Sequence, residues 1–477
     1  MDSSILNNKN IKANLMISVK LVVSLPDQFL FNSMEIQTSH PSLKPIEKKS
    51  RIVTLDVLRG IALLGILLMN INGFGLAWGY NDPSVLGGDT GLNLITWKVS
   101  NLLFEGTMRA LFSLLFGVGM YIFLDRLVQK GAGIKAADIY FRRITWLLIF
   151  GLIHGYLLLW LGEILYDYAL MGFLVYSFRQ VDPKKLIISG LLLFCIGTWW
   201  NYQDYQKDKE WYDKVQQAEL ALASGQEVSN ELKETKDSWE KRESKTSPEA
   251  MEKFTEEMHK GYFSVVSHLG PIMYDFNTNN PYRTEVWDVL GMMLIGIALF
   301  RLGFLTGEKP AYIYWWMVVI GYVVGIAINY YEMQLVLEAQ FSSLSFVQSN
   351  ITYYWGRFFV AMGHIGIIML FCKYPILPGL KKSLASVGKM ALTNYLMHSV
   401  ICLFVFTGAG LGLFSRLERF ELLYVVLAIW VFQLITSPIW LKYFQYGPME
   451  WLWRSLSYQK IQPFRLPSTM TLIKNEA

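Results

Sequence analysis

The chain has 477 residues, of which 53% are hydrophobic and 17% are charged. Soluble chains carry about 25% charged residues, so this composition, with its repeated apolar runs of about 20 residues, indicates an all-α protein that crosses a membrane many times. The net charge of +5 therefore informs topology and gives no reason to expect nucleic-acid binding. The three cysteines lie in apolar runs without metal-ligand spacing, which argues against a disulfide framework or a bound metal.

Residues 1–46 are mixed and polar, and we expect a poorly ordered N-terminal extension. Its weak apolar patch at 15–25 is too short and too polar for a span, and no cleavage site follows it. Met1 and Met34 both remain candidates for the first residue. The fold should depend little on this region.

Ten apolar runs are long enough to be membrane spans. We predict them at 53–75, 97–124, 144–161, 164–179, 184–201, 284–305, 311–330, 351–372, 386–407 and 421–441. The first five would form one bundle (47–201) and the last five a second bundle (284–445). Lysine and arginine concentrate in alternate connections, which places both termini in the cytoplasm.

Two segments lie outside these spans. The long connection 202–283 is rich in acidic residues and shows helical apolar spacing, so we expect short amphipathic helices on the extracytoplasmic side. They could form a lid over an outward-facing site or simply a solvated insertion. Residues 446–477 should form a short interfacial helix and a cytoplasmic tail.

The first span begins with two charged residues and ends with a carboxamide. Asp56 and Arg59 are spaced i and i+3, so they can pair on one helical face, and Asn70 follows near the outer end. A basic residue at the start of a helix, such as Arg59, also orients ordinary first spans. The pattern alone therefore leaves a structural role and a functional one open.

Further polar residues fall within the next spans. Glu105 and Arg109 have the spacing of a helical ion pair, and His154 lies between two glycines that permit close helix packing. Glu163 and Asp167 flank a short hairpin just after it. Because charges at bilayer depth cost several kcal/mol, such residues are usually paired and functional.

The second half carries fewer such groups. Arg357 and Asn394 lie in the eighth and ninth predicted spans, and these spans also hold His364 and His398. A lone intramembrane histidine can serve merely to tie two helices together. With the predicted topology, however, most of these charges fall in the outer half of the bundle, as a polar cavity requires.

Five segments in order resemble the YeiB-like bacterial membrane family. They are LDVLRGIALLGILLMNI (55–71), LFSLLFGVG (111–119), FGLIHGYLLLWLGEILYDYALMG (150–172), VGKMALTNYLMHS (387–399) and YFQYGPMEWLWRSLSY (443–458). The resemblance covers nearly the whole chain after residue 50, and it implies a multi-pass protein of the bacterial inner (plasma) membrane. In that family GEIL is more usually GDIL and the position of His398 is often Gln, which implies a carboxylate role for Glu163 and a dispensable His398.

The first span is also similar to that of two better understood groups, the acyltransferase-three proteins and heparan-glucosaminide N-acetyltransferase. Asp56, Arg59 and Gly60 match their DxxRG-like start, and Asn70 stands at their polar position. The second group has a catalytic histidine in the next outer loop, whereas 72–96 contains none here. An acid–base role would therefore have to fall elsewhere, and His154 is the candidate.

The resemblance implies a transmembrane acyltransferase that moves an acyl group, most simply acetyl, from cytoplasmic acyl-CoA to an outer glycan, lipid or small molecule. No tightly bound cofactor is expected beyond this co-substrate. The roles divide as follows: catalysis by His154, Asn70, Glu163 and Asp167, with Asn70 and Arg109 steadying the oxyanion; substrate binding by Glu105, Arg109, Arg357 and Asn394; acyl-CoA binding by Arg59, Arg142 and Arg143.

Two other functions remain open. The same buried charges could bind a solute or relay protons in a transporter or flippase. Alternatively, the outer loop could make the protein a scaffold or sensor. No HExxH, P-loop, GxSxG or CxxC signature is present to indicate other chemistry. The partners we expect are the bilayer and the acceptor, and a homodimer is compatible with the sequence.

Overall fold

The computed structural model describes residues 52–79, 83–86 and 88–466, and every regular element in them is a helix. The predicted all-α class is thereby confirmed. The predicted extension 1–46 and the tail beyond residue 466 lie outside the described residues.

The helices are mostly long and follow one another with short connections. Up to the outer loop they are α2 (Val53–Gly75), η3 (Pro83–Leu86), α3 (Gly91–Leu103), α4 (Thr107–Gln129), α5 (Ile134–Leu157), α6 (Leu165–Val175), η4 (Tyr176–Phe178) and α7 (Pro183–Ala223). The outer loop and second half hold α8 (Asn230–Glu243), η5 (Ser244–Thr246), α9 (Pro248–Met258), α10 (Tyr262–Asn280), η6 (Pro281–Leu290), α11 (Gly291–Arg301), α12 (Ala311–Glu338), α13 (Ser343–Ser349), α14 (Tyr353–Lys373), α15 (Pro378–Lys389), α16 (Ala391–Phe406), α17 (Leu422–Tyr443) and α18 (Pro448–Tyr458).

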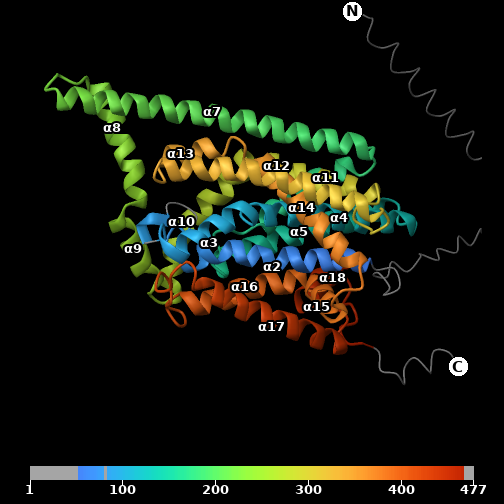
Figure 1. Cartoon of the computed structure of the whole chain (residues 1–477). Helices are drawn as coiled ribbons and strands as arrows, with labels where there is room; N and C mark the ends of the chain where they lie inside the picture. The colour runs from blue at the N-terminus through green and yellow to red at the C-terminus, as the bar shows by residue number, and fades with distance from the viewer. Residues whose placement is uncertain (1–51, 80–82, 87, 467–477) are drawn as a thin grey trace, which may run out of the picture. The chain divides into compact units, whose positions relative to one another are not determined.

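Helix α2 is the most deeply enclosed of the long helices. It packs against α4, α14, α15, α16 and α17 (Figure 1), and its most apolar window of 18 residues is 72% buried. Most of its residues are leucine, isoleucine, alanine or glycine, so it can pack against neighbours on every side. The segment that carries Asp56, Arg59 and Asn70 is therefore the axis of the bundle.

The peripheral helices have the opposite character. In α7, α12 and α17 the most apolar stretch of 18 residues is only 22%, 17% and 28% buried. Helix α12, for example, exposes Trp315, Trp316 and Val323. A continuous apolar surface of this kind is unfavourable in water and suits contact with lipid.

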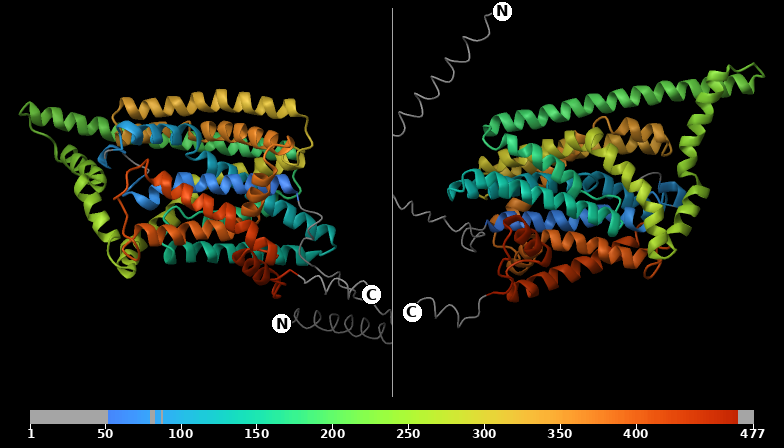
Figure 2. Two further views of the ribbon diagram at one scale, coloured as in Figure 1. Left: turned by 60° about the horizontal axis from the view of Figure 1, so that its bottom comes forward. Right: turned by 180° about the vertical axis from the view of Figure 1, so that it is seen from behind.

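The two ends of the bundle differ. Helices α15 and α18 and the start of α2 meet at one end, and α8, α9 and α13 lie at the other (Figures 1 and 2). At the first end Lys373 Nζ donates to the carbonyl of Lys309 at 3.1 Å, so two predicted cytoplasmic connections meet there. Following the predicted orientation, we call this the inner end and the opposite one the outer end.

Six helices among the described residues are long and apolar enough to cross a membrane, or seven if α15 and α16, bent by 82°, count as one span. The sequence predicts ten. Helices α6 and α11 account for part of the difference, because each has 11 residues. At 1.5 Å per residue such a helix covers roughly 16 Å of a hydrocarbon layer that is roughly 30 Å thick.

Two predicted spans have different limits in the structure. The second, predicted as 97–124, is broken between α3 and α4 at Gly106, whose φ of 65° lies in the left-handed region that glycine tolerates. The fifth, predicted as 184–201, is part of α7, which has 41 residues and extends to Ala223, far past the apolar run. Apolar content locates a span, but helices end at backbone signals and not where hydrophobicity ends.

The outer loop is built from α8, α9 and α10 and covers the outer end of the bundle. Helix α7 projects past the bundle, and α8 and α9 return along that end (Figure 2). Met251, Phe254 and Met258 of α9 share one apolar cluster with Ile71 of α2 and Phe406 of α16. The loop is therefore joined to the bundle by a hydrophobic contact and is more than a solvated insertion.

Candidate functional site

Three polar side chains from separate segments meet in the interior; we call them the relay. His154 of α5 lies with Nδ1 3.3 Å from Glu163 Oε1 and with Nε2 2.6 Å from Ser399 Oγ of α16. Their exposed fractions are 0%, 7% and 1%. The sequence leaves Glu163 and Asp167 as alternative partners of His154; the structure pairs His154 with Glu163 and adds the serine.

The hairpin between α5 and α6 fixes the carboxylate of the relay. Glu163 accepts hydrogen bonds from the backbone N–H groups of Leu165 at 2.5 Å and Tyr166 at 2.8 Å, at the start of α6. A Cβ atom at Gly151 would lie 2.5 Å from Tyr166 N and 2.9 Å from Glu163 Oε2. Glycine at this position is therefore what allows the hairpin to fold back onto α5.

The hydrogen-bond roles in the relay follow from donor and acceptor capacity. A carboxylate only accepts, so a neutral His154 donates from Nδ1 to Glu163, and its Nε2 accepts from the Ser399 hydroxyl. Serine, histidine and a carboxylate in this order form the arrangement that activates a serine hydroxyl in many hydrolases and transferases. The relay can thus remove a proton from Ser399.

A pocket of about 220 Å³, the inner pocket, opens near the inner end. Its lining includes five cationic side chains against two acidic ones, Asp56 and Glu450. The cations are Arg59, Arg126, Arg143, Lys389 and Arg454. Aromatic and aliphatic side chains form the rest of its wall, among them Phe112, Phe123 and Trp453. The pocket can therefore hold a ligand with an anionic end and an apolar arm.

Of the three basic residues expected to bind acyl-CoA, two line this pocket. Arg59 pairs with Asp56 at 3.1 Å, as its spacing predicts. The guanidinium of Arg143 lies 3.4 Å above the Trp453 ring, and its Nε and Nη1 atoms are buried without a hydrogen-bond partner among the described residues. Arg142 lies outside the pocket and pairs at 2.6 Å with Asp138, whose side chain is 60% exposed.

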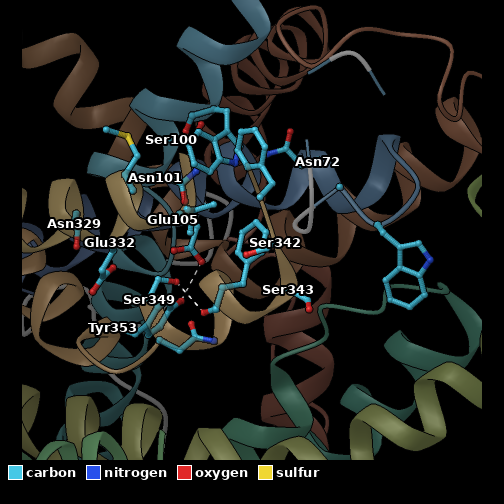
Figure 3. A pocket seen from close by; sticks show the side chains of 18 of the residues that line it. Asn72, Ser100, Asn101, Glu105, Asn329, Glu332, Ser342, Ser343, Ser349 and Tyr353 are labelled. Carbon is cyan, nitrogen blue, oxygen red and sulfur yellow. Dashed lines mark hydrogen bonds between the residues drawn. The ribbon is translucent and has the colours of Figure 1, made fainter. Parts of the chain in front are cut away.

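A larger cavity of about 730 Å³, the outer chamber, lies at the outer end. Figure 3 shows polar side chains from α2, α3, α12, α13 and α14 around it. Arg242 and Glu243 of α8 also line it, and Glu243 accepts a hydrogen bond from Ser343 at 2.8 Å. The outer loop therefore forms part of the chamber wall, as a lid would.

Charged side chains form a network in one wall of the chamber. Arg357, only 7% exposed, binds Glu105 at 2.7 Å and also pairs with Glu332 of α12. Tyr353 adds a hydrogen bond to Glu105 at 3.0 Å (Figure 3). The predicted binding residues Glu105 and Arg357 are thus brought together, whereas Glu332 and Tyr353 were not predicted.

The remaining predicted residues make other contacts. Arg109 pairs with Asp288 at 2.5 Å. Asn394 donates to Ser437 Oγ of α17 at 3.0 Å, a contact that ties two helices together. Asn70 is buried in α2, and Asp167 lies in the first turn of α6, four residues beyond Glu163.

A third, mainly apolar pocket of about 150 Å³ lies between the relay and the outer chamber. It shares Trp78 and Gly79 with the chamber lining, and Gly162 and Cys402 border it on the relay side. Leu165, two residues beyond Glu163, lines the inner pocket. Inner pocket, relay, apolar pocket and outer chamber therefore follow one another through the bundle.

These features define an α-helical bundle with apolar outer surfaces suited to contact with lipid and with polar cavities toward both ends. The model of the DUF418 family, which is described as a protein of unknown function, matches residues 299–460. The uncharacterized protein YeiB of Escherichia coli K12 is 31% identical over 436 residues, covering 87% of this chain and 98% of that protein. YxaH of Bacillus subtilis 168 is 30% identical over 450 residues, covering 88% and 98%.

The chain therefore belongs to the YeiB-like family. This confirms the resemblance found in the sequence motifs. No solved structure matches significantly. The relatives' names describe no activity, so the function is inferred from the site.

Proposed function

We propose that the protein is a transmembrane acyltransferase of the bacterial inner membrane. It would move an acyl group, most simply acetyl, from cytoplasmic acyl-CoA to an acceptor outside the cytoplasm. The observation that carries this proposal is the position of the buried Ser399–His154–Glu163 relay between a cation-lined inner pocket and the outer cavities. A relay of this type suits acyl transfer, and its placement suits transfer across the membrane.

The inner pocket suits the donor. Acyl-CoA carries phosphates at one end and a long, flexible thioester arm at the other. Two nitrogens of Arg143, Nε and Nη1, have no hydrogen-bond partner among the described residues, and guanidinium binds phosphate strongly through charge-assisted hydrogen bonds. The apolar wall can then guide the arm inward to Leu165 and Tyr395, which lie beside the relay.

The chemistry assigned to the relay is general base catalysis. Histidine is suited to proton transfer near neutral pH, and an adjacent carboxylate orients it. Glu163 provides that orientation from a fixed hairpin. His154 would thus remove the proton from the attacking group and return it to the leaving group.

The outer chamber suits an acceptor with many hydroxyl groups, such as a glycan. Serine and amide side chains supply directional hydrogen bonds, and the aromatic rings of Trp78, Trp97 and Phe341 supply flat apolar faces. The polar side chains are Asn72, Ser100, Asn101, Asn329, Gln340, Ser342, Ser343, Ser349 and Asn350. A lipid or a small metabolite bearing a hydroxyl or amine remains compatible with the same lining.

The test uses membranes that contain the full-length protein and acetyl-CoA labelled in the acetyl group. We expect label to pass to an acceptor with the wild-type protein and to be lost with His154→Ala. His398→Gln is the matched control, because His398 is equally buried but binds Gln433 at 3.0 Å and lies outside the relay. Full transfer by His154→Ala at normal expression would exclude this mechanism.

A transporter or flippase is the second candidate. Cavities toward opposite ends, separated by a closed layer, are also what alternating access requires. Solute flux into proteoliposomes without acyl-CoA would favour it. Acyl transfer without flux would favour the enzyme.

A further inference from the structure

We propose that Ser399 is a covalent carrier, which takes the acyl group from the donor in the inner pocket and releases it to the acceptor on the outer side. This inference rests on the proposed acyltransferase function. It adds an acyl-serine intermediate and a named nucleophile.

The face of α16 that carries Ser399 connects the two sides. Tyr395 lines the inner pocket, and Cys402 lines the apolar pocket. Spacings of four and three residues place both on the same helical face as Ser399, about 6 Å below it and about 4.5 Å above it along the helix axis. Ser399 therefore lies within one helical turn, or little more, of each cavity.

The environment of Ser399 separates it from the other buried serines. Ser113 binds the Tyr168 hydroxyl at 2.7 Å, and Ser457 donates to the carbonyl of Trp453 at 2.6 Å. These are contacts that stabilise helices. Among the buried serines of the described residues, Ser399 is the one that forms a hydrogen bond with a histidine, at 2.6 Å. That histidine is in turn held by a carboxylate, as nucleophilic catalysis requires.

The separation of the cavities favours a covalent step. Direct transfer would require donor and acceptor to meet in one cavity. Here the inner pocket and the outer cavities have no lining residue in common, and the relay occupies the layer between them. An acyl group carried on a serine in that layer would be received from the inner side and released to the outer side, in two half-reactions without an open channel.

In the first half-reaction Ser399 Oγ attacks the thioester carbonyl. The Oγ–acyl bond forms and the carbon–sulfur bond breaks, while His154 Nε2 takes the hydroxyl proton and passes it to the departing sulfur, giving free CoA thiol. In the second half-reaction the acceptor hydroxyl or amine attacks the acyl-serine. His154 takes the acceptor's proton and returns it to Ser399 Oγ, which restores the enzyme. Neither step needs an oxidant or a reductant.

The test uses the full-length protein purified in detergent, without acceptor, and acetyl-CoA labelled in the acetyl group. After acid quenching and digestion, we expect one acetyl group on the peptide that contains Ser399. Ser399→Ala should abolish this adduct and lower transfer in membranes by more than about 100-fold, in the range of general base and nucleophilic contributions. Ser113→Ala, an equally buried serine that binds a tyrosine, should leave both signals unchanged.

Ser399→Cys provides a readout that a merely structural serine would not give. It should form a thioester that hydroxylamine cleaves at neutral pH, while the wild-type ester resists that treatment. Two outcomes would overturn the proposal: acetyl transfer at the wild-type rate by a folded Ser399→Ala protein, or label on another residue with Ser399 unmodified. Absence of any acyl transfer by the wild-type protein would instead refute the proposed function itself.

Discussion

Glu105 and Arg357 are 252 positions apart in the chain, yet their side chains meet at 2.7 Å in the wall of the outer chamber. Arg357 is also bound by Glu332 and by the Asn329 carboxamide at 3.2 Å. One guanidinium thus holds two carboxylates from different helices. The chamber keeps its shape because α12, α14 and the break before α4 share this network.

Replacing Arg357 by Ala should destabilise the protein strongly. Two carboxylates would be left close together without their cation, and breaking one partner out of a buried ion pair costs about 3–5 kcal/mol. Arg142→Ala is the control, since its pair with the exposed Asp138 should contribute about 0–1 kcal/mol. Thermal unfolding in detergent measures both. Equal melting temperatures for the two variants would show that the network is not structural.

Of two adjacent arginines, Arg143 lines the inner pocket and Arg142 does not. Arg143→Gln should raise KM for acyl-CoA by about 10–100-fold, the equivalent of one charge-assisted hydrogen bond of about 1.5–3 kcal/mol. Arg142→Gln should leave KM unchanged, because its side chain lies outside the pocket. Steady-state kinetics on membranes distinguish them. A rise in KM in the Arg142 variant alone would place the donor elsewhere.

The predictions that succeeded depend on local spacing. Asp56 and Arg59 pair as an i, i+3 motif should, and His154 meets Glu163 because only a short hairpin separates them. The all-helical class followed from the composition and the repeated apolar runs of about 20 residues. Contacts between residues close in sequence can be predicted because helix geometry fixes which residues share a face.

The long-range contacts could not be predicted in this way. Ser399 stands 245 residues from His154, and no periodicity connects them. The one available signal was that Ser399 ends the motif VGKMALTNYLMHS. Likewise Arg142 and Arg143 are equivalent by composition, and only the rotation of α5 decides which one faces the pocket.

Glu450 is expected to stabilise the bend between α15 and α16. Its carboxylate accepts from the backbone N–H groups of Leu392 at 2.7 Å and Thr393 at 3.1 Å and from the Thr393 hydroxyl at 2.6 Å. It thereby satisfies donors in the first turn of α16. Burial raises the pKa of this carboxyl, and these hydrogen bonds oppose the rise.

Glu450→Ala should therefore lower stability by about 1–2 kcal/mol, as loss of a helix cap does. Glu450→Gln should have a smaller effect, because its carbonyl oxygen can still accept from the backbone. Urea or thermal unfolding of the detergent-solubilised protein provides the comparison. The cap assignment would be wrong if the glutamine variant were as unstable as the alanine variant.

The crossing of α2 and α15 depends on two glycines. A Cβ atom at Gly388 would lie 1.9 Å from the carbonyl oxygen of Asp56, and one at Gly60 would lie 2.1 Å from that of Leu384. Backbone atoms cannot move aside as a flexible side chain can, so Gly388→Ala should force the helices apart and cost about 1–3 kcal/mol or more. Gly379→Ala, on the same helix with nothing within 4 Å, should be neutral or slightly stabilising.

The separation of α2 from α15 should also change the inner pocket, because Gly388 and Asp56 both line it, so KM for acyl-CoA should rise in the Gly388 variant alone. Unfolding temperature and KM measured together test this coupling, and a destabilised Gly388→Ala protein with unchanged KM would show that the crossing supports the fold without shaping the donor site.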